Sequence, residues 1–274
     1  MEAVRPYVEQ LDAVVNKYWT QALGPQHELS KALPYVNPTI GLGFFTGYLL
    51  FVTVLCPIMY ASGFKVSLKP VMRLYNLFMV VLSTYMGTYA LYLAYHSNSS
   101  VWCVPLASGD AGAEMAKLVW IFTYSKTLEF FDSVSMAVEG RWRQLSFLHV
   151  YHHVSILAYW YAILWMAPGS DAYFSLAINS YIHVIMYGYY LLASFGYSPW
   201  WKFYITRMQI LQFCSFVGQS IYVGYIRNDC DFPPLLAKGL MWYMFTLIAL
   251  FLNFLIVNQY SKRSKKSGAV KKSQ

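Results

Sequence analysis

The sequence predicts an all-α, polytopic membrane protein with seven transmembrane helices. Hydrophobic residues make up 58% of its 274 residues and charged residues 12%, whereas about 25% of a typical soluble domain is charged. Seven apolar windows are each about twenty residues long, which is enough for a helix to cross the hydrocarbon core. These observations exclude a disordered chain, a collagen-like or disulfide-rich secreted module and an ordinary cytosolic enzyme.

The expected spans follow one another with short connections, which indicates one bundle without a linker. The windows are 40–61, 71–95, 115–136, 145–166, 172–195, 202–226 and 235–258. Turn-forming residues separate several of them, namely Ala61-Ser62-Gly63, Ser108-Gly109-Asp110, Pro168-Gly169-Ser170 and Pro233-Pro234. We divide the chain into an N-terminal lumenal arm (1–39), a seven-helix transmembrane domain (40–260) and a basic cytosolic tail (261–274). The arm is too polar for a secretory signal.

The distribution of Lys and Arg predicts the orientation. Thirteen of these residues lie in one set of loops and in the tail, against four on the other side, so the first set is expected in the cytosol. The final residues, Lys271-Lys272-Ser273-Gln274, are similar to a dilysine signal for retrieval to the endoplasmic reticulum. The formal charge of +8 indicates a membrane surface as partner and not nucleic acid, because the basic residues do not gather on one folded segment.

Two cysteines fall in loops assigned to the oxidising lumen, and we expect them to form a Cys103–Cys230 disulfide. Cys56 and Cys214 lie inside expected spans, where a free thiol is typically a small apolar packing residue. Asn98-Ser99-Ser100 is a glycosylation sequon. It lies close to the second span, and we expect it to be unused.

Polar side chains inside the spans identify the candidate site, because each costs about 2.5–3.5 kcal/mol at a helix centre. The third to sixth spans carry them at helical spacings. They are Lys126, Glu129 and Asp132 in the third span, His149, His152 and His153 in the fourth, Asn179, His183 and Tyr187 in the fifth, and Gln209 and Gln212 in the sixth. Given the orientation above, four helices direct polar groups toward one level of the membrane.

Each group also has a structural interpretation. The amides are compatible with interhelical hydrogen bonding, and Lys126 with a buried ion pair to Glu129 or Asp132. Three histidines within five residues are different, because packing rarely requires them. A metal site is one alternative, as in metal-dependent membrane desaturases and hydroxylases, but those enzymes use more histidines than the six present here. Proton transfer or nucleophilic attack by a neutral imidazole is the other.

Four ordered motifs give the chain a family resemblance. The motifs are KTLEFFDS at 126–133, HVYHH at 149–153, NSYIHVIMYGYY at 179–190 and TRMQILQ at 206–212. Together they resemble the fatty-acid elongase family, the membrane 3-oxoacyl-CoA synthases of the endoplasmic reticulum. Ser133 stands where the family usually has Thr, which keeps the hydroxyl. The resemblance implies six of the seven helices in a barrel around a narrow tunnel open to the cytosol, with no metal and no cofactor.

The reaction implied is decarboxylative condensation of an acyl-CoA with malonyl-CoA to a 3-oxoacyl-CoA. Cys214 lies about 200° around the helix from Gln212, so we expect an imidazole and not a thiol as the acyl acceptor. The resemblance implies His152 for this role, through an acyl-imidazole. His149, His153 and His183 are expected to orient it, move protons or stabilise the enolate. The expected substrate contacts are Lys126, Glu129, Asp132, Asn179, Tyr187, Gln209 and Gln212, and the expected contacts to CoA phosphates are Arg141, Arg143, Lys202 and Arg207.

The sequence in and around these motifs is most similar to that of elongases that act on polyunsaturated acyl chains. We therefore expect this substrate preference. The expected partners are acyl-CoA, malonyl-CoA, the lipid bilayer and the ketoreductase, dehydratase and enoyl reductase of the elongation cycle, with a homo-oligomer left open. A seven-helix receptor or transporter remains the alternative from another class. The sequence lacks a receptor's Asp-Arg-Tyr run, and its prolines are confined to loops and span ends.

Overall fold

The computed structural model describes residues 5–97, 100–106, 109–227 and 229–271, with the backbone alone from residue 258 onward. Within these residues every regular element is helical and no strand occurs, which confirms the all-α prediction. The Asn98-Ser99 part of the sequon and the last residues of the dilysine-like tail, 272–274, lie outside the described residues.

Helices coincide with each expected span. The first span comprises α3 (Pro38–Leu50), a π-helical turn (Phe51–Leu55) and α4 (Cys56–Ser62), and the second is α5 (Lys69–His96). The following ones are α6 (Gly109–Leu128) with α7 (Phe130–Val138), α8 (Phe147–Met166) and α9 (Ala172–Ser194). A 3₁₀ turn (Trp200–Phe203), α10 (Ile205–Ile221) and a second π-helical turn (Tyr222–Ile226) form the sixth, and α11 (Pro234–Lys271) forms the seventh and continues beyond it.

Three of these stretches are long and apolar enough to cross a membrane by length and composition, namely Pro38–Ser62, Lys69–His96 and Pro234–Val257. The helices of the other four expected spans are shorter or more polar. They carry the charged, imidazole and amide side chains of the candidate site, which lower the mean hydropathy of their sequences. The most apolar helices therefore contribute lipid-facing surface, and the more polar ones contribute the interior.

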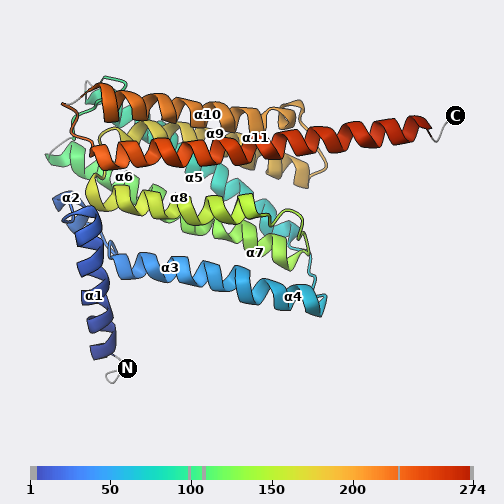
Figure 1. Cartoon of the computed structure of the whole chain (residues 1–274), viewed down its shortest axis with the longest axis horizontal. Helices are drawn as coiled ribbons and strands as arrows, with labels where there is room; N and C mark the ends of the chain where they lie inside the picture. Colours follow the sequence, from blue (N-terminus) through green and yellow to red (C-terminus); the bar gives the residue numbers. More distant parts are fainter. Residues whose placement is uncertain (1–4, 98–99, 107–108, 228, 272–274) are drawn as a thin grey trace.

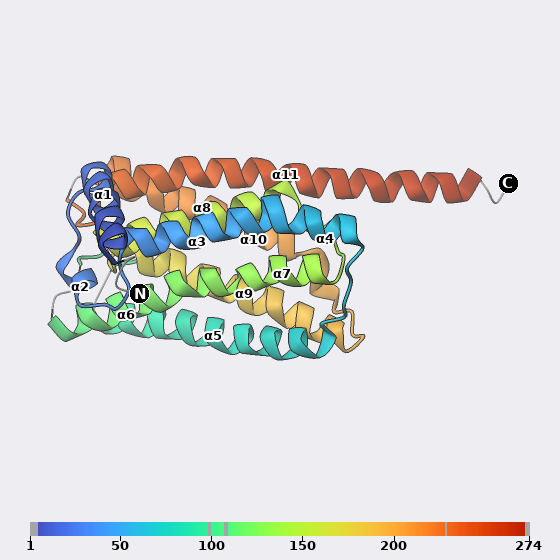
Figure 2. The same cartoon turned by 90° about the horizontal axis from the view of Figure 1, so that it is seen from below.

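The helices from α3 to α11 run along one common direction in an elongated bundle (Figures 1 and 2). Helix α5 packs along α9, α10 along α11, and α6 along α8. The α5–α9 contact is close because Gly87 has no side chain. A Cβ atom at this position would lie 3.2 Å from the Cβ of Ser180 and 3.4 Å from the carbonyl oxygen of Ala177.

The start of α3 is held by a cap and by a buried tyrosine. The side chain of Asn37 accepts a hydrogen bond from the Thr39 N–H (2.8 Å), and Pro38 occupies the first turn, both of which favour a helix start. The Tyr161 hydroxyl of α8 donates to the Asn37 carbonyl (2.6 Å) and accepts from the Asn37 N–H (3.1 Å). Gly41 lets the Tyr161 ring approach, since a Cβ there would lie 3.1 Å from it.

The single helix expected over 115–136 is divided at Glu129. Helix α6 ends at Leu128 and α7 begins at Phe130. The Asp132 N–H bonds to the Glu129 carbonyl, three residues back, at 3.1 Å, which is the tighter 3₁₀ pattern. This tightening interrupts the helix at Glu129, whose buried carboxylate contacts Lys126 of α6 and His183 of α9.

The N-terminal arm contains two helices that the sequence analysis did not predict. Helix α1 (Arg5–Leu23) runs across the long axis of the bundle at the end opposite the C-terminus, and α2 (Glu28–Lys31) follows it (Figure 1). Two hydrogen bonds attach this part of the arm to α8: the Gly24 carbonyl, just after α1, accepts from the Trp165 indole (3.0 Å), and the Ser30 hydroxyl of α2 donates to the Leu164 carbonyl. The arm therefore closes one end of the bundle.

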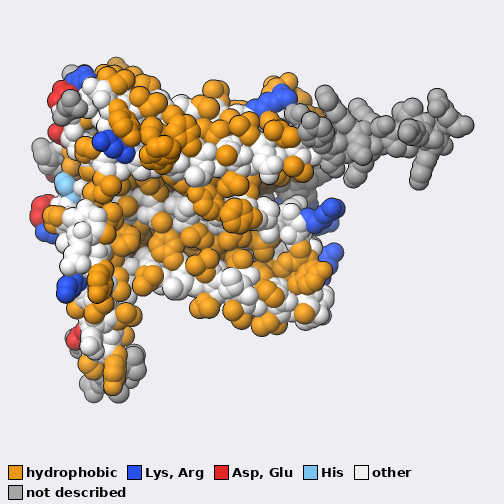
Figure 3. Space-filling view, viewed as in Figure 1, with side chains coloured by type: hydrophobic (Ala, Val, Ile, Leu, Met, Phe, Trp, Pro, Cys, Tyr) orange, Lys and Arg blue, Asp and Glu red, His pale blue; other side chains and the backbone are white. Residues whose placement is uncertain are grey.

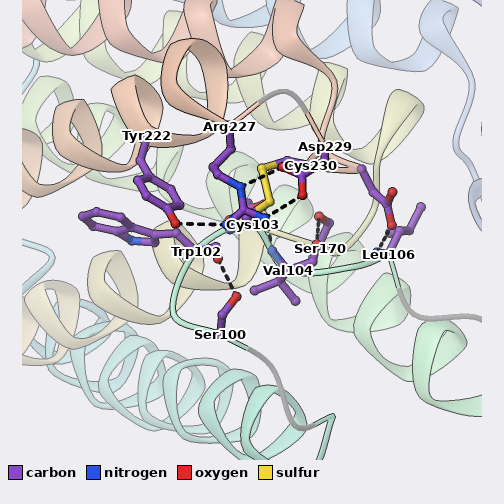
Figure 4. Close-up of a disulfide and its surroundings, with 12 residues drawn as sticks. Ser100, Trp102, Cys103, Val104, Leu106, Ser170, Tyr222, Arg227, Asp229 and Cys230 are labelled. Atoms are coloured by element: carbon purple, nitrogen blue, oxygen red, sulfur yellow. Dashed lines mark hydrogen bonds and ion pairs between the residues drawn. A yellow bond between two sulfur atoms is a disulfide. The ribbon is translucent and has the colours of Figure 1, made fainter.

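A disulfide lies at the same end. It joins Cys103, between α5 and α6, to Cys230, between α10 and α11 (Figure 4). The N–H groups of Cys103 and Val104 donate to the carboxylate of Asp171 at 2.7 and 3.2 Å, and Asp171 directly precedes α9. Burial raises the pKa of the Asp171 carboxyl, while these N–H donors lower it. The disulfide thus links two loops to the start of a site-bearing helix.

We expect the Cys103→Ser variant to lose about 2–5 kcal/mol of stability, because the disulfide constrains a long loop of the unfolded chain. Thermal unfolding in detergent measures this loss. Cys214→Ser, at an exposed free thiol, is the matched control and should unfold like the parent chain. If all four cysteines of the unreduced, unfolded parent react with a maleimide, the bond is absent.

Candidate active site

A buried ion pair within the third expected span contacts two side chains of the fifth. The Lys126 ammonium lies 2.7 Å from Oε1 of Glu129 and donates to Oδ1 of Asn179 at 3.0 Å. Nδ1 of His183 lies 3.3 Å from the same Glu129 oxygen. Of the two carboxylates that the sequence left open as partners of Lys126, the structure selects Glu129.

This network is almost fully withdrawn from the surface. The side chains of Lys126 and Glu129 are 1% and 2% exposed, and the Lys126 ammonium also lies 4.1 Å from the centroid of the Phe122 ring. A buried charge is tolerated only when it is paired and hydrogen-bonded. Each of the two ions has the other as partner and one further polar contact, from Asn179 or His183.

Asp132 belongs to a separate network. Its Oδ2 accepts a hydrogen bond from the Tyr187 hydroxyl at 2.7 Å and one from the Tyr75 hydroxyl at 3.4 Å. Tyr187 was expected at the site, whereas Tyr75, from α5, was not. The chain has 25 tyrosines, and no motif distinguishes this one in the sequence. Because of these two hydroxyls, Asp132 supports the wall next to His183 without contacting Lys126.

His149 is held by two hydroxyl groups. Its Nε2 lies 2.8 Å from Oγ of Ser133, and the same Oγ lies 2.8 Å from the Tyr48 hydroxyl. Tyr48 comes from α3 and is buried, although the sequence analysis placed no site residue on the first span. The departure from Thr at Ser133 keeps the hydroxyl in use. This chain of three groups fixes the orientation of the His149 ring and can pass a proton along it.

His152 faces a cavity between α8, α9, α10 and α11. The cavity, which we call the histidine cavity, is lined by His152, Asn179 and Gln212 from three of these helices, by the hydroxyl-bearing Tyr159 and Ser175, and by apolar side chains such as Ile156, Trp160 and Phe216. Nδ1 of His152 and Oε1 of Gln212 are buried without a hydrogen-bond partner among the described residues. Such unpaired atoms are costly, so this is the place where a polar ligand would be stabilised.

A second cavity continues from the first toward the disulfide end. We call it the end cavity. It shares Tyr159, Ser175 and Leu240 with the histidine cavity, and Asp171 and Gln219 lie at its other end. Gln219 donates to the Asp171 carbonyl at 2.8 Å. Residues 152 and 163 of α8 line the two cavities and lie eleven positions apart, about 16 Å along a helix. The two cavities follow each other along α8 and share part of their mostly apolar lining.

The other expected site residues are distributed around this core. The His153 ring lies 4.3 Å from that of His149 and 5.6 Å from that of His152, so the three imidazoles are neighbours. Gln209 contacts Sδ of Met186 at 3.9 Å and is not among the residues that line the histidine cavity. Cys214 is exposed, in agreement with its expected position away from Gln212.

The four basic residues expected to hold CoA phosphates differ in availability. Arg141 is engaged by Glu139, with 2.8 Å between Nε and Oε2, and by Ser135. Lys202 donates to the Ser198 hydroxyl. Arg207 lies over the Tyr204 ring, and Arg143 is exposed. Arg143 and Arg207 are therefore the better candidates for an anion, and Arg141 is chiefly structural.

Potential metal ligands come together at one place among the described residues, where Cys103, Asp229 and Cys230 bring their ligand atoms within 4.8 Å of one another. Both sulfur atoms are joined in the disulfide and cannot act as thiolates. This group therefore does not have the donor set of a metal site.

The fold and the site together define a helical membrane protein with an imidazole-lined cavity that leads into an apolar path between its helices. The chain belongs to the ELO family, described as GNS1/SUR4, whose profile it matches over residues 33–268.

Curated relatives are consistent with this family. Fatty acid elongase 6 of Leishmania major is 35% identical over 242 residues, which are 85% of this chain and 63% of that protein. This chain thus spans less than two thirds of that relative. Very long chain fatty acid elongase 2 of Mus musculus is 30% identical over 271 residues, 94% of this chain and 90% of the relative. Very long chain fatty acid elongase 4 of Homo sapiens is 34% identical over 241 residues, covering 85% and 75%.

We expect Lys126→Met to destabilise the protein by about 3–5 kcal/mol, because it leaves the Glu129 charge buried and unpaired. The double variant Lys126→Met, Glu129→Gln should recover much of this loss. Thermal unfolding in detergent and the double-mutant cycle measure the coupling.

Lys117→Met is the matched control. Lys117 pairs with Glu114 at the same spacing of three residues and the same 2.7 Å, but the two side chains are 57% and 42% exposed, and such a pair contributes about 0–1 kcal/mol. Equal losses for the two lysine variants would contradict the structural role of the buried pair.

Proposed function

We propose that this protein catalyses the decarboxylative condensation of a long-chain acyl-CoA with malonyl-CoA to a 3-oxoacyl-CoA. The observation that carries the proposal is the histidine cavity. His152 and Gln212 both line it, and Nδ1 of His152 and Oε1 of Gln212 are buried without a hydrogen-bond partner among the described residues. Its continuation as an apolar path suits an acyl chain. Membership of a family whose relatives are named fatty acid elongases supports the same reaction class.

The first half-reaction transfers the acyl group to His152. A ring nitrogen attacks the thioester carbonyl carbon, a C–N bond forms, the C–S bond breaks, and CoA leaves as the thiolate, which takes up the proton released by the imidazole. The amide groups of Asn179 and Gln212 line the same cavity. In this proposal their NH₂ groups donate hydrogen bonds to the oxygen on which negative charge develops.

The second half-reaction forms the new carbon–carbon bond. Malonyl-CoA loses carbon dioxide, and the electron pair of the broken bond remains as the enolate of acetyl-CoA. The enolate carbon attacks the acyl carbonyl and the C–N bond breaks. The departing imidazolate takes up a proton from water, which regenerates the imidazole of His152. The product is an acyl chain that is two carbons longer, carried as its 3-oxoacyl-CoA.

The surrounding networks orient these groups. Lys126 holds Asn179 at 3.0 Å, and Glu129 holds both Lys126 and His183, so the ion pair acts on the substrate through its neighbours. His149, with Ser133 and Tyr48 behind it, provides a route for protons at the edge of the histidine cluster.

The proposal extends to topology and location. It places seven spans in the endoplasmic reticulum membrane, six of them around the cavities as a barrel, with the lumenal arm at residues 1–39 and the tail at 261–274 in the cytosol. CoA phosphates would contact Arg143 and Arg207, with Lys202 near them. A preference for polyunsaturated acyl chains, the absence of a metal or cofactor requirement, and cooperation with the ketoreductase, dehydratase and enoyl reductase of the cycle complete it.

Release of labelled carbon dioxide from malonyl-CoA, dependent on acyl-CoA, tests the reaction directly. We expect His152→Ala to abolish release while the protein stays folded, because the acceptor nitrogen is lost. Acyl-CoA alone should liberate free CoA from the parent protein and leave an adduct on His152.

Cys214→Ser is the matched control and should retain full turnover. An adduct on a cysteine, or turnover by His152→Ala, would remove His152 as the acceptor. A complete lack of malonyl-CoA-dependent release by the folded parent protein would overturn the proposed reaction.

We expect Ser175→Phe to shorten the acyl chains that the protein accepts. Ser175 lines both cavities, so a larger side chain there obstructs the path between them without touching His152. Carbon dioxide release from a series of acyl-CoA substrates measures the change. Short substrates should keep their rates while long ones lose theirs, and an equal loss for all lengths would contradict a continuous path.

A further inference from the structure

Helix α1 lies outside the set of helices that run along the bundle axis. It runs across the direction of the long helices, at the level of their ends, and its N-terminal part projects beyond α3 (Figures 1 and 2). It contacts the start of α3. Most of its side chains are exposed, so packing against the other helices does not account for it.

One side of α1 attaches it to the bundle. The side chain of Asn37, the cap of α3, donates to Oδ1 of Asp12 at 2.6 Å. The Trp19 ring meets the Tyr161 ring edge to face, with 6.2 Å between their centroids. Asp12 and Trp19 lie seven residues apart and share one side of the helix, and these contacts fix its direction.

A second side carries an exposed apolar stripe. Tyr7, Leu11, Val14 and Tyr18 follow at spacings of four, three and four residues, which align them along a helix. Their exposed fractions are 73%, 51%, 46% and 65%. In water such a stripe would be unfavourable.

The third side of α1 is polar. Its exposed residues are Glu9, Gln10, Lys17 and Thr20. Figure 3 shows that acidic and basic side chains of the projecting part lie along the edge turned away from α3, while hydrophobic ones lie along the edge turned toward it. The charges thus point beyond the end of the bundle, and the apolar stripe points back along the spans.

The stripe lies beside a stretch of chain that could cross a membrane. Residues Pro38–Ser62, which begin next to α1, are long and apolar enough to cross a membrane. Their flank exposes Leu42, Leu49 and Leu50 at 43%, 42% and 60%, a surface suited to lipid. Because α1 contacts the start of α3, its stripe lies next to one end of this apolar stretch.

We propose that α1 is an interfacial helix that binds the surface of the lipid bilayer on the side opposite the C-terminal tail. Its stripe lies among the acyl chains just below the headgroups, and its polar side faces water, which is the arrangement of in-plane amphipathic helices. Through Asp12, Asn37 and Trp19, it fixes the end of α3 relative to the membrane. This inference does not depend on the proposed reaction.

Spin labels on the full-length protein in phosphatidylcholine vesicles test the proposal. The background variant Cys56→Ala, Cys214→Ala keeps the disulfide and removes both free thiols. Nitroxides are attached at Leu11→Cys and Val14→Cys and, as matched controls on the polar side, at Gln10→Cys and Lys17→Cys. Power saturation then compares collisions with oxygen, which concentrates in lipid, and with a water-soluble nickel chelate.

We expect the ratio of oxygen to nickel accessibility to be several-fold higher at positions 11 and 14 than at 10 and 17. Tyr18→Cys and Thr20→Cys repeat the comparison one turn further along, should one labelled variant fail to fold. Equal nickel accessibility on both sides would place α1 in water and overturn the proposal. Shielding of positions 11 and 14 from both reagents would show that a second copy or another protein covers the stripe, and would overturn it as well.

Discussion

The buried contact between Lys126 and Glu129 is the constraint on which the rest of the site depends. Two charges inside apolar helices are tolerated only as partners, and here the pair also holds Asn179 and His183 on the neighbouring helix. The chain tightens between α6 and α7 at Glu129. Helix α7 begins directly after this interruption. It contains Asp132, which bonds to Tyr187, and Ser133, which bonds to His149. Residues of the ion pair and of the two other polar networks thus all lie within positions 126–133 of the chain.

The sequence predicted the core of the site because polar groups are expensive in apolar helices, so each one present carries information. Lys126, Glu129, Asn179 and His183 were identified in this way, and the structure brings them together. The same argument fails for hydroxyls on aromatic rings. Tyrosine packs like an apolar residue, and its role follows only from what lies opposite. Tyr48 and Tyr75 were therefore missed, and their neighbours decide their function.

The helices were predicted from their apolar length, and the interruptions were not. The divisions at residues 51–55, at Glu129 and at 222–226 are local changes of backbone hydrogen bonding, which leave the mean hydropathy of a window unchanged. Helix α1 was missed for the opposite reason. Its apolar residues, such as Leu11 and Val14, form a stripe too narrow to raise the average of a window, so only their helical spacing distinguishes them.

The disulfide has a consequence for the order of biosynthesis. Its two cysteines are separated by 127 positions, and Cys230 emerges only after α10 has been made. Until then Cys103 remains a free thiol. In the folded protein its own N–H donates to the carboxylate of Asp171. A ribosome must therefore have translated all but the last helix before this disulfide can form. In a nascent chain arrested earlier, the loop that carries Cys103 would have no covalent link to the α10–α11 connection.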